Sequence, residues 1–117
     1  MPENPIVNKS LEFSISILTY CDYLNSKRKF IIANQLLKSG TSIGANIFEA
    51  QHAESRLDFI HEMKIALKEA NETSYWLTLC GRIEDLSVQK ELSHVLNELM
   101  LILSKIVVTS KKNLSKN

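Results

Sequence analysis

The placement of proline constrains the fold of this chain more than any other sequence feature. The only two prolines are Pro2 and Pro5, and both precede Lys9. From Lys9 to the C-terminus no residue forbids a helix, because proline is the residue that removes a backbone donor and kinks the chain. No alternation of apolar and polar residues lasts long enough to indicate a sheet. The sequence therefore predicts an all-α fold without an internal repeat or a low-complexity linker.

Apolar residues recur at helical spacing in four segments, and helices are expected at about residues 7–26, 30–53, 55–81 and 87–110. Short connections such as "SKRK" and "GRIEDLS" separate them. Gly81 is a plausible helix end, because glycine accepts the left-handed conformation found there. Ser87 is a candidate N-cap for the last helix. This arrangement predicts one domain spanning residues 1–117 that folds as an up-and-down antiparallel four-helix bundle.

The first and last helices have apolar faces wider than one helix contact requires. In the first helix, one stripe consists of Leu11, Ile15, Leu18 and Cys21, and a second consists of Phe13, Ile17, Tyr20 and Leu24. The extra width indicates a second surface to bury, which favours self-association. The alternative is a monomer with an unusually apolar surface.

Two of the three glycines, Gly40 and Gly44, lie in the string "QLLKSGTSIGANIFEAQ". A phosphate-binding loop would need a preceding strand and a lysine after the second glycine, and neither is present. Glycine within a helix costs roughly 1 kcal/mol relative to alanine, so a pair on one helix face indicates a compensating contact. We expect one continuous helix whose small residues let a neighbouring helix approach closely. The alternative is a break between two helices near "SGTSIG".

Two pairs of glutamate and histidine have a spacing that could indicate a metal or catalytic centre. Glu49 with His52, and Glu91 with His94, both show the i, i+3 spacing of di-iron bundles. In an up-and-down bundle these pairs would lie on the order of 20–25 Å apart along the axis, so no metal, cofactor or catalytic residue is predicted. The alternative function is a small-molecule or metal-dependent bundle enzyme that uses Glu49, Glu69 and Glu72 beside Trp76. With Asn46, these carboxylates are instead expected to form a polar network between the second and third helices.

Basic residues are the candidates for nucleic-acid contact, because such contacts need groups that neutralise phosphate. The candidates are Lys27, Arg28, Lys29, Lys64, Lys68, Lys111 and Lys112. The net charge of +1 gives the whole molecule no strong field, and a surface of solvated charges is the alternative.

Cysteine usage and the N-terminal sequence bear on the location of the protein. Cys21 and Cys80 have no CxxC context and lie among apolar residues, so they are expected to be buried free thiols, with a disulfide or a metal pair as alternatives. "MPENPIVNKS" has no apolar signal core, and no apolar run is expected to reach the roughly 20 residues of a membrane span. These features predict a cytoplasmic protein without a membrane partner.

Two strings resemble a known family, "QLLKSGTSIGANIFEA" at 35–50 and "FIHEMKIALKEANETSYWLTL" at 59–79. They are similar to the four-helix-bundle proteins encoded in intervening sequences of bacterial 23S rRNA genes, over about residues 8–110. More distantly, the chain resembles the accessory variability determinant proteins of diversity-generating retroelements, which are strongly basic and bind nucleic acid and a reverse transcriptase. This chain departs from those proteins in its net charge of +1.

The resemblance implies a non-enzymatic antiparallel bundle that forms a homo-oligomeric ring, with a pentamer as the expected size. It also implies an RNA or protein partner, and it supplies no catalytic residues. The positions that correspond to the motifs of the family are interpreted as architectural: Gly40, Gly44, Asn46, Glu49, Glu69, Glu72 and Trp76.

Overall fold

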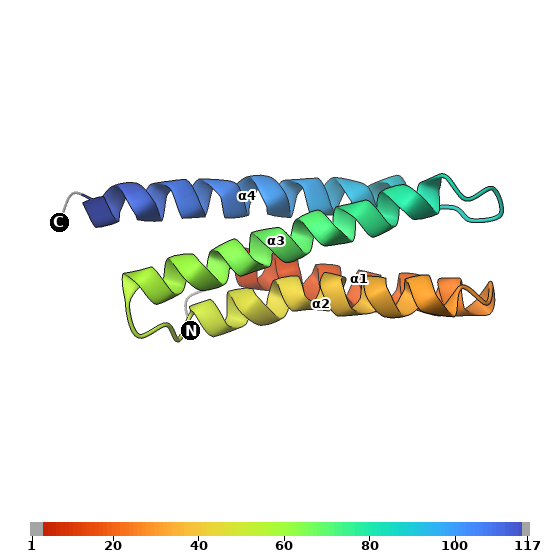
Figure 1. The fold of residues 1–117 in the computed structure, drawn as a ribbon, viewed down its shortest axis with the longest axis horizontal. Coiled ribbons are helices and arrows are strands. Elements are labelled where there is room, and N and C mark those ends of the chain that lie inside the picture. Colours follow the sequence, from red (N-terminus) through yellow and green to blue (C-terminus); the bar gives the residue numbers. More distant parts are fainter. Residues whose placement is uncertain (1–3, 116–117) are drawn as a thin grey trace.

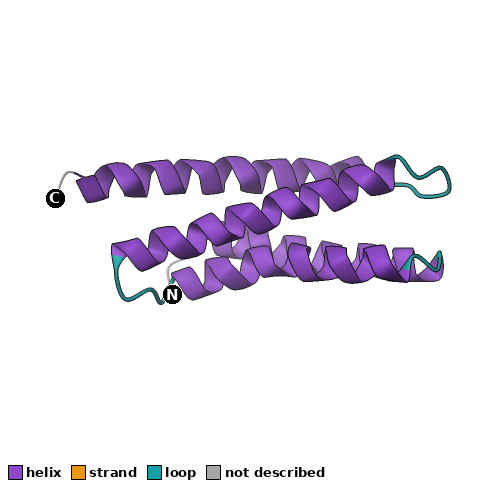
Figure 2. Cartoon of the chain, in the orientation of Figure 1, coloured by secondary structure: helices purple, strands orange, loops and turns teal. Residues whose placement is uncertain are grey.

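The computed structural model describes residues 4–115 and places them in four helices joined by short connections (Figure 1). The helices are α1 (Pro5–Ser26), α2 (Phe30–Ala50), α3 (Arg56–Gly81) and α4 (Lys90–Ser115). Between residues 4 and 115 there is no strand (Figure 2). Successive helices run in opposite directions along a body 53 Å long. The predicted all-α, up-and-down bundle is therefore confirmed.

Each helix contacts the next one in the chain, and α1 also contacts α4. This closes the four helices into a bundle in which α2 and α4 lie on opposite corners. The α1–α2 and α3–α4 connections lie at one end of the bundle, and the α2–α3 connection lies at the other end (Figure 1).

The core uses one of the two apolar stripes of α1 and leaves most of the other exposed. Phe13, Ile17 and Leu24 are buried, whereas Leu11 and Ile15 are 53% and 58% exposed. The other three helices complete the core with side chains that are fully or almost fully buried: Leu36, Ile43, Ile47, Met63, Leu96, Leu99 and Leu103.

The helix α4 meets the length and composition of a membrane-crossing segment over Lys90–Leu114, which differs from the sequence expectation that no run approaches this length. In the bundle this helix contributes Leu96, Leu99 and Leu103 to the core. The core therefore accounts for part of its apolar composition, because 28% of this window is buried.

The Gly40–Gly44 segment is one continuous helix, and both glycines face α1. A Cβ atom built on Gly40 would lie 2.9 Å from Cγ1 and Cγ2 of Ile17. A Cβ atom on Gly44 would lie 3.3 Å from Oγ of Ser14 and 3.4 Å from the carbonyl oxygen of Ser10. Close approach of α1 and α2 therefore requires glycine at position 40 more strictly than at position 44.

A buried pair of hydroxyl groups joins α2 to α3 and sets their register. The Thr73 hydroxyl group hydrogen-bonds to Oγ of Ser39 at 3.0 Å, and both residues are fully buried. The single proton of the Thr73 hydroxyl group can be donated either to Ser39 or to the carbonyl oxygen of Glu69 at 2.8 Å, and the Ser39 hydroxyl group can donate to the carbonyl oxygen of Leu36, so neither hydroxyl group lacks a partner. Because the helices are antiparallel, a residue of α2 that follows Ser39 lies level with the residue of α3 that precedes Thr73 by the same number of positions.

Several helix ends differ from the sequence expectation. The helix α2 ends at Ala50 rather than near residue 53, and Ser55 caps α3 by accepting a hydrogen bond from the backbone N–H of Asp58 at 3.1 Å. Gly81 is the last residue of α3, but it does not have a left-handed backbone. The sequence reason for that helix end was therefore wrong.

The helix α4 begins at Lys90 rather than at residue 87, and it continues to Ser115 rather than to residue 110. Ser87 does not act as its N-cap, because tyrosine side chains of α1 bind the Ser87 backbone. Ser87 is thus engaged in a tertiary contact with α1 in the segment that precedes α4.

The end of α1 is a Schellman motif with arginine in the position that glycine usually occupies. Arg28 has a φ of 63°, and it is the only non-glycine residue of the described chain with positive φ. Its backbone N–H donates to the carbonyl oxygen of Asn25, and the Lys29 N–H donates to that of Leu24, both at 2.9 Å. The motif satisfies carbonyl groups that the helix end would otherwise leave without a partner.

Replacing each interior glycine with alanine should distinguish the two positions. In Gly40→Ala the new methyl group meets the buried, β-branched Ile17. Overpacking of this kind costs about 1–3 kcal/mol, which opposes the gain of about 1 kcal/mol in helix propensity. Gly44→Ala should be neutral or stabilising. Urea unfolding followed by circular dichroism measures both, and a Gly40→Ala variant as stable as Gly44→Ala would contradict the close-packing interpretation.

Arg28→Gly should stabilise the protein by about 1 kcal/mol, because a left-handed backbone costs a non-glycine residue about that much. The matched control is Lys27→Gly, where φ is −90° and glycine should only destabilise. Thermal unfolding of both variants measures the difference. A loss of stability in Arg28→Gly would show that the arginine side chain contributes more than its backbone strain costs.

Candidate functional site

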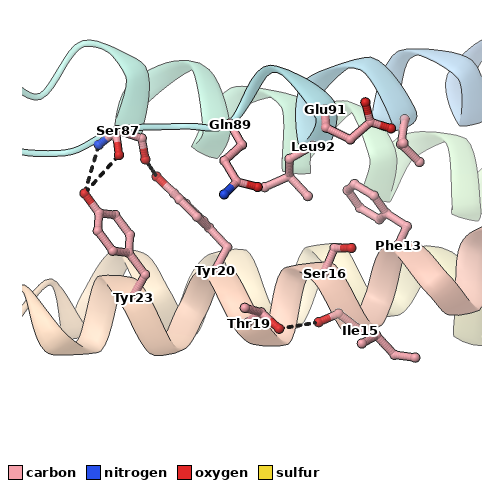
Figure 3. Close-up of a pocket in the computed structure, with 11 residues that line it drawn as sticks. Phe13, Ile15, Ser16, Thr19, Tyr20, Tyr23, Ser87, Gln89, Glu91 and Leu92 are labelled. Carbon is pink, nitrogen blue, oxygen red and sulfur yellow. Dashed lines mark hydrogen bonds between the residues drawn. The ribbon is translucent and has the colours of Figure 1, made fainter.

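A surface pocket with a mixed polar and apolar lining lies between α1 and the start of α4, and we call it the α1–α4 pocket. It has a volume of about 440 Å³. Figure 3 shows side chains of α1 on one side and the segment from Ser87 to Leu92 on the other. The lining consists of Phe13, Ile15, Ser16, Thr19, Tyr20, Tyr23, Ser87, Gln89, Glu91, Leu92 and Val95.

Two tyrosines of α1 bind the backbone of Ser87 at one end of this pocket, one at the carbonyl group and the other at the N–H group. The Tyr20 hydroxyl group donates to the Ser87 carbonyl oxygen at 2.9 Å, and the Ser87 N–H donates to the Tyr23 hydroxyl oxygen at 3.0 Å (Figure 3). The two rings lie 5.4 Å apart between centroids. Burial raises the pKa of Tyr20, whereas the hydrogen bonds from Ser87 lower the pKa of Tyr23.

The α1–α4 pocket presents one charged group, the carboxylate of Glu91, together with hydroxyl groups, an amide and aromatic rings. Such a lining suits a neutral or positively charged group and repels an anion. Sequence reasoning missed this pocket, because its residues come from two segments that no motif connects. The i, i+3 spacing of Tyr20 and Tyr23 was the single local signal.

The glutamates proposed for the alternative enzyme lie on the surface shared by α2 and α3, but at different heights. By the Ser39–Thr73 register, Glu49 lies level with residue 63. Glu69 and Glu72 are therefore displaced from it by about 9 Å and about 14 Å along the axis. This spacing gives the three carboxylates no common point at which to act on one substrate.

Asn46, Glu72 and Trp76 form hydrogen bonds within their own helices. The Asn46 side chain donates to the carbonyl oxygen of Ser42 at 2.8 Å, and the Trp76 indole N–H donates to the Glu72 carboxylate at 3.2 Å. The expected polar network between the second and third helices is therefore wrong for Asn46 and Glu72, because each finds a partner one turn away. The Trp76 ring also contacts Tyr75 edge-on, at 5.0 Å between centroids.

The candidate nucleic-acid contacts lie at different places along the bundle. Residues 27–29 lie in the α1–α2 connection at one end, and Lys111 and Lys112 lie in the last turns of α4 at the other end (Figure 1). Lys64 and Lys68 are exposed along α3 between these ends. The seven residues thus do not form one compact patch.

Two of these cations have partners within the chain. Lys29 forms an ion pair with Asp85 at 3.9 Å, which ties the two connections at that end together. Lys27 lies 6.0 Å above the ring of Tyr23. Exposed pairs of this kind contribute little to stability, about 0–1 kcal/mol each.

The histidines of the two ExxH pairs are separated in the structure. His52 lies in the turn after α2, and His94 lies on α4, a helix that makes no contact with α2. His94 is 3.4 Å from Glu98, whose carboxylate also binds Lys9 of α1 at 3.3 Å. Within residues 4–115 there is no group of three or more histidine, cysteine, aspartate or glutamate side chains placed to hold a metal ion.

Cys21 and Cys80 are both buried free thiols, as the sequence predicted. The Cys21 thiol donates to the carbonyl oxygen of Ala33 at 3.4 Å, a bond from α1 to α2. Burial raises the pKa of Cys21 to about 11 and also raises the pKa of Cys80. Both therefore remain protonated at neutral pH and are poor nucleophiles.

Comparison with known proteins assigns the fold to a family. The profile of a family described as 23S rRNA-intervening sequence protein matches residues 3–107. This chain belongs to that family. The family resemblance expected from residues 35–50 and 59–79 is therefore confirmed.

A solved relative supports the same assignment. It is the crystal structure of a protein with unknown function from the S23 ribosomal protein family of Bacteroides thetaiotaomicron, which is 44% identical to this chain. The match covers 87% of this chain and 97% of that protein, with a TM-score of 0.81. No curated protein matches the chain. The comparisons thus give the family and fold and assign no activity.

Raising the pH should destabilise this family member. A group whose pKa is higher in the folded protein than in the unfolded chain binds its proton more tightly in the folded protein. The free energy of unfolding therefore falls as the pH increases. For Cys21 the window runs from its ordinary value of 9.0 to about 11. Urea unfolding across this window should show the decline, and Cys21→Ala should show a shallower one. Equal declines in the two proteins would remove Cys21 from the explanation.

Proposed function

We propose that this protein is a non-enzymatic, cytoplasmic assembly protein that forms a homo-oligomer, a pentameric ring, and presents a surface to an RNA or protein partner. The observation that carries the proposal is the apolar surface shared by α1 and α2. Of the ten large apolar side chains that are exposed among the described residues, six belong to these two helices. They are Leu11, Ile15, Leu18, Phe30, Ile31 and Phe48.

Leu11, Ile15 and Leu18 recur at the spacing of one helix face, so they form a continuous stripe along α1. The stripe borders a depression of about 190 Å³ between α1 and α2 whose lining includes Leu11, Gly44 and Phe48. Because Gly44 has no side chain, the depression is deep enough to accept an apolar side chain from another copy. We call the three residues of α1 together with Phe48 the α1–α2 strip.

The α1–α2 strip refines the sequence expectation that the first and last helices carry the associating faces. The stripe of α1 is exposed as expected; Leu11 adjoins α2 in the depression, whereas Ile15 also lines the α1–α4 pocket. On α4 only Leu101 and Val108 are exposed to a comparable extent. Exposed apolar surface on this scale is characteristic of protein–protein contacts.

The alternative function as a bundle enzyme has weaker support. Its carboxylates are spread along the axis of α2 and α3, and Glu72 binds Trp76 of its own helix. The α1–α4 pocket contributes a single carboxylate, Glu91, together with the phenol groups of Tyr20 and Tyr23, whose pKa values are shifted in opposite directions. Both phenol groups are already hydrogen-bonded to the Ser87 backbone, a structural contact, so the pocket offers weaker support for acid–base catalysis.

Light scattering coupled to size-exclusion chromatography tests the assembly. The wild-type mass should be about five times the chain mass of 13.3 kDa. Leu18→Glu places a charge in the α1–α2 strip and should shift the protein to monomer. The matched control is Leu101→Glu, at an exposed leucine of α4, which should leave the mass unchanged.

Two outcomes would contradict the proposal. One is a wild-type protein that remains monomeric at tens of micromolar. The other is a Leu101→Glu variant that dissociates while Leu18→Glu does not, which would place the contact on α4. Circular dichroism of both variants ensures that a change in mass is not a loss of fold.

A further inference from the structure

The helix α3 separates its charges onto two sides. Its four acidic residues, Asp58, Glu62, Glu69 and Glu72, follow one another at steps of four, seven and three. Glu69 lies one turn before Thr73, whose hydroxyl group binds Ser39 of α2, so this acidic stripe lies toward α2. The basic residues of α3 do not share this spacing.

The lysines of α3 lie on its exposed outer side, between the acidic stripe and the groove that separates α3 from α4. Lys64 is two heptads before Thr78, which lines a groove between α3 and α4. Lys68 is one turn after Lys64, and Arg82 follows it after two heptads. All three side chains are exposed.

The side of α4 that faces α3 carries no acidic residue. The two acidic residues of α4, Glu91 and Glu98, lie seven positions apart on the side that faces α1. Glu98 binds Lys9 of α1, and Glu91 lines the α1–α4 pocket. On the side that faces α3 are Lys90 and His94, which line the α3–α4 groove.

We define the α3–α4 basic face by Lys64, Lys68, Arg82 and Lys90. None of these four side chains forms an ion pair with another residue of the described chain. His94 is the single group at the edge of this face that reaches an acid, Glu98. These four positive charges thus lie on one exposed surface without an ion pair within residues 4–115. Glu72, one turn after Lys68, is a carboxylate beside this face, and it binds the indole N–H of Trp76.

The groove at the edge of this face, which Lys90 lines, has polar chemistry suited to a phosphate and sugar backbone. Its volume is about 670 Å³, and no aspartate or glutamate lines it. The polar side chains of its lining are Ser74, Thr78, Lys90, Ser93, His94 and Asn97. Hydroxyl and amide groups of this kind supply many of the hydrogen bonds to phosphate and sugar in nucleic-acid complexes.

An exposed aromatic ring lies among these cations. Tyr75 is 60% exposed, and it lies seven residues from both Lys68 and Arg82, which places the three on one line of α3. Its edge contact with Trp76 fixes the ring without covering it. An aromatic side chain beside a positively charged track is the arrangement on which bases of single strands stack.

We propose that a single-stranded nucleic acid binds across the α3–α4 basic face, with phosphates at Lys64, Lys68 and Lys90 and a base stacked on Tyr75. This proposal names the partner that the proposed function leaves open. It depends on the proposed function only for the existence of a partner. The face lies within one protomer, so binding does not depend on assembly. An acidic protein would satisfy the lysines, but it gives no role to the hydroxyl groups of the groove or to Tyr75.

Fluorescence anisotropy with a labelled oligouridylate tests the phosphate contacts. The variants Lys64→Glu and Lys68→Glu are each compared with Lys38→Glu, an exposed lysine of α2 with the same change of charge. Each α3 variant should weaken binding about tenfold and reduce the slope of log affinity against log salt by about 0.7, the value for one phosphate of a single strand. The control should change binding less than twofold.

The stacking contact is tested by Tyr75→Leu, which should weaken binding about tenfold at an unchanged salt slope. Tyr75→Trp is the conservative variant and should retain binding. Oligothymidylate of the same length distinguishes the source of the strand. Equal affinity indicates recognition of the shared phosphate and base chemistry, and tighter binding of the oligouridylate indicates RNA.

The proposal is overturned if no oligonucleotide binds at low salt, or if Lys38→Glu weakens binding as much as the α3 variants do. It is also overturned if a duplex of the same length binds more tightly and Tyr75→Leu has no effect. The same titration on the Leu18→Glu protein separates the two proposals. If the monomeric Leu18→Glu variant still binds the oligonucleotide, the result supports the basic face independently of assembly. If the wild-type protein is itself a monomer and binds, the result contradicts only the proposed assembly.

Discussion

The close approach of α1 and α2 at Gly40 is the constraint on which the rest of the bundle depends. A methyl group at position 40 would collide with Ile17, which is fully buried at the centre of α1. Because the two backbones are this close, Phe13, Ile17 and Leu24 point into the core, and the opposite stripe of α1 must face outward. The exposed α1–α2 strip thus includes the side of α1 that this packing leaves outside the core.

One end and the middle of the bundle are stabilised by different interactions. At one end, Tyr20 and Tyr23 bind the Ser87 backbone, and Lys29 pairs with Asp85 of the α3–α4 connection. These contacts lie in the segment that precedes α4, beside the α1–α4 pocket. At the middle, the buried Ser39–Thr73 pair sets the register of α2 against α3. That register separates Glu49 from Glu69 and Glu72, and it directs the acidic stripe of α3 away from α4.

The candidate sites could be predicted from the sequence only in part. The resemblance identified the family, and the basic residues Lys64 and Lys68 were recognised as candidates for nucleic-acid contact. Lys90 and Tyr75 were not recognised, and the net charge of +1 argued against a binding surface. A net charge is a sum over all sides of the molecule, so it cannot report that acidic and basic residues lie on different sides of α3. Ser87 shows the same limit at one residue. Its sequence context is typical of an N-cap, but phenol groups of two residues far away in the sequence bind it instead.

The sequence by itself determined four helices, their antiparallel order and the family of the chain. Helix periodicity, the absence of interior proline and the length of the connections are all local properties, and they act within a few residues of one another. Only the tertiary structure decided which apolar stripe of α1 is buried, where α4 begins and on which face the lysines of α3 lie. Each of these depends on the rotation of one helix about its axis relative to its neighbours. Contacts such as Gly40 with Ile17 and Thr73 with Ser39 fix that rotation, and such contacts join residues that the sequence keeps far apart.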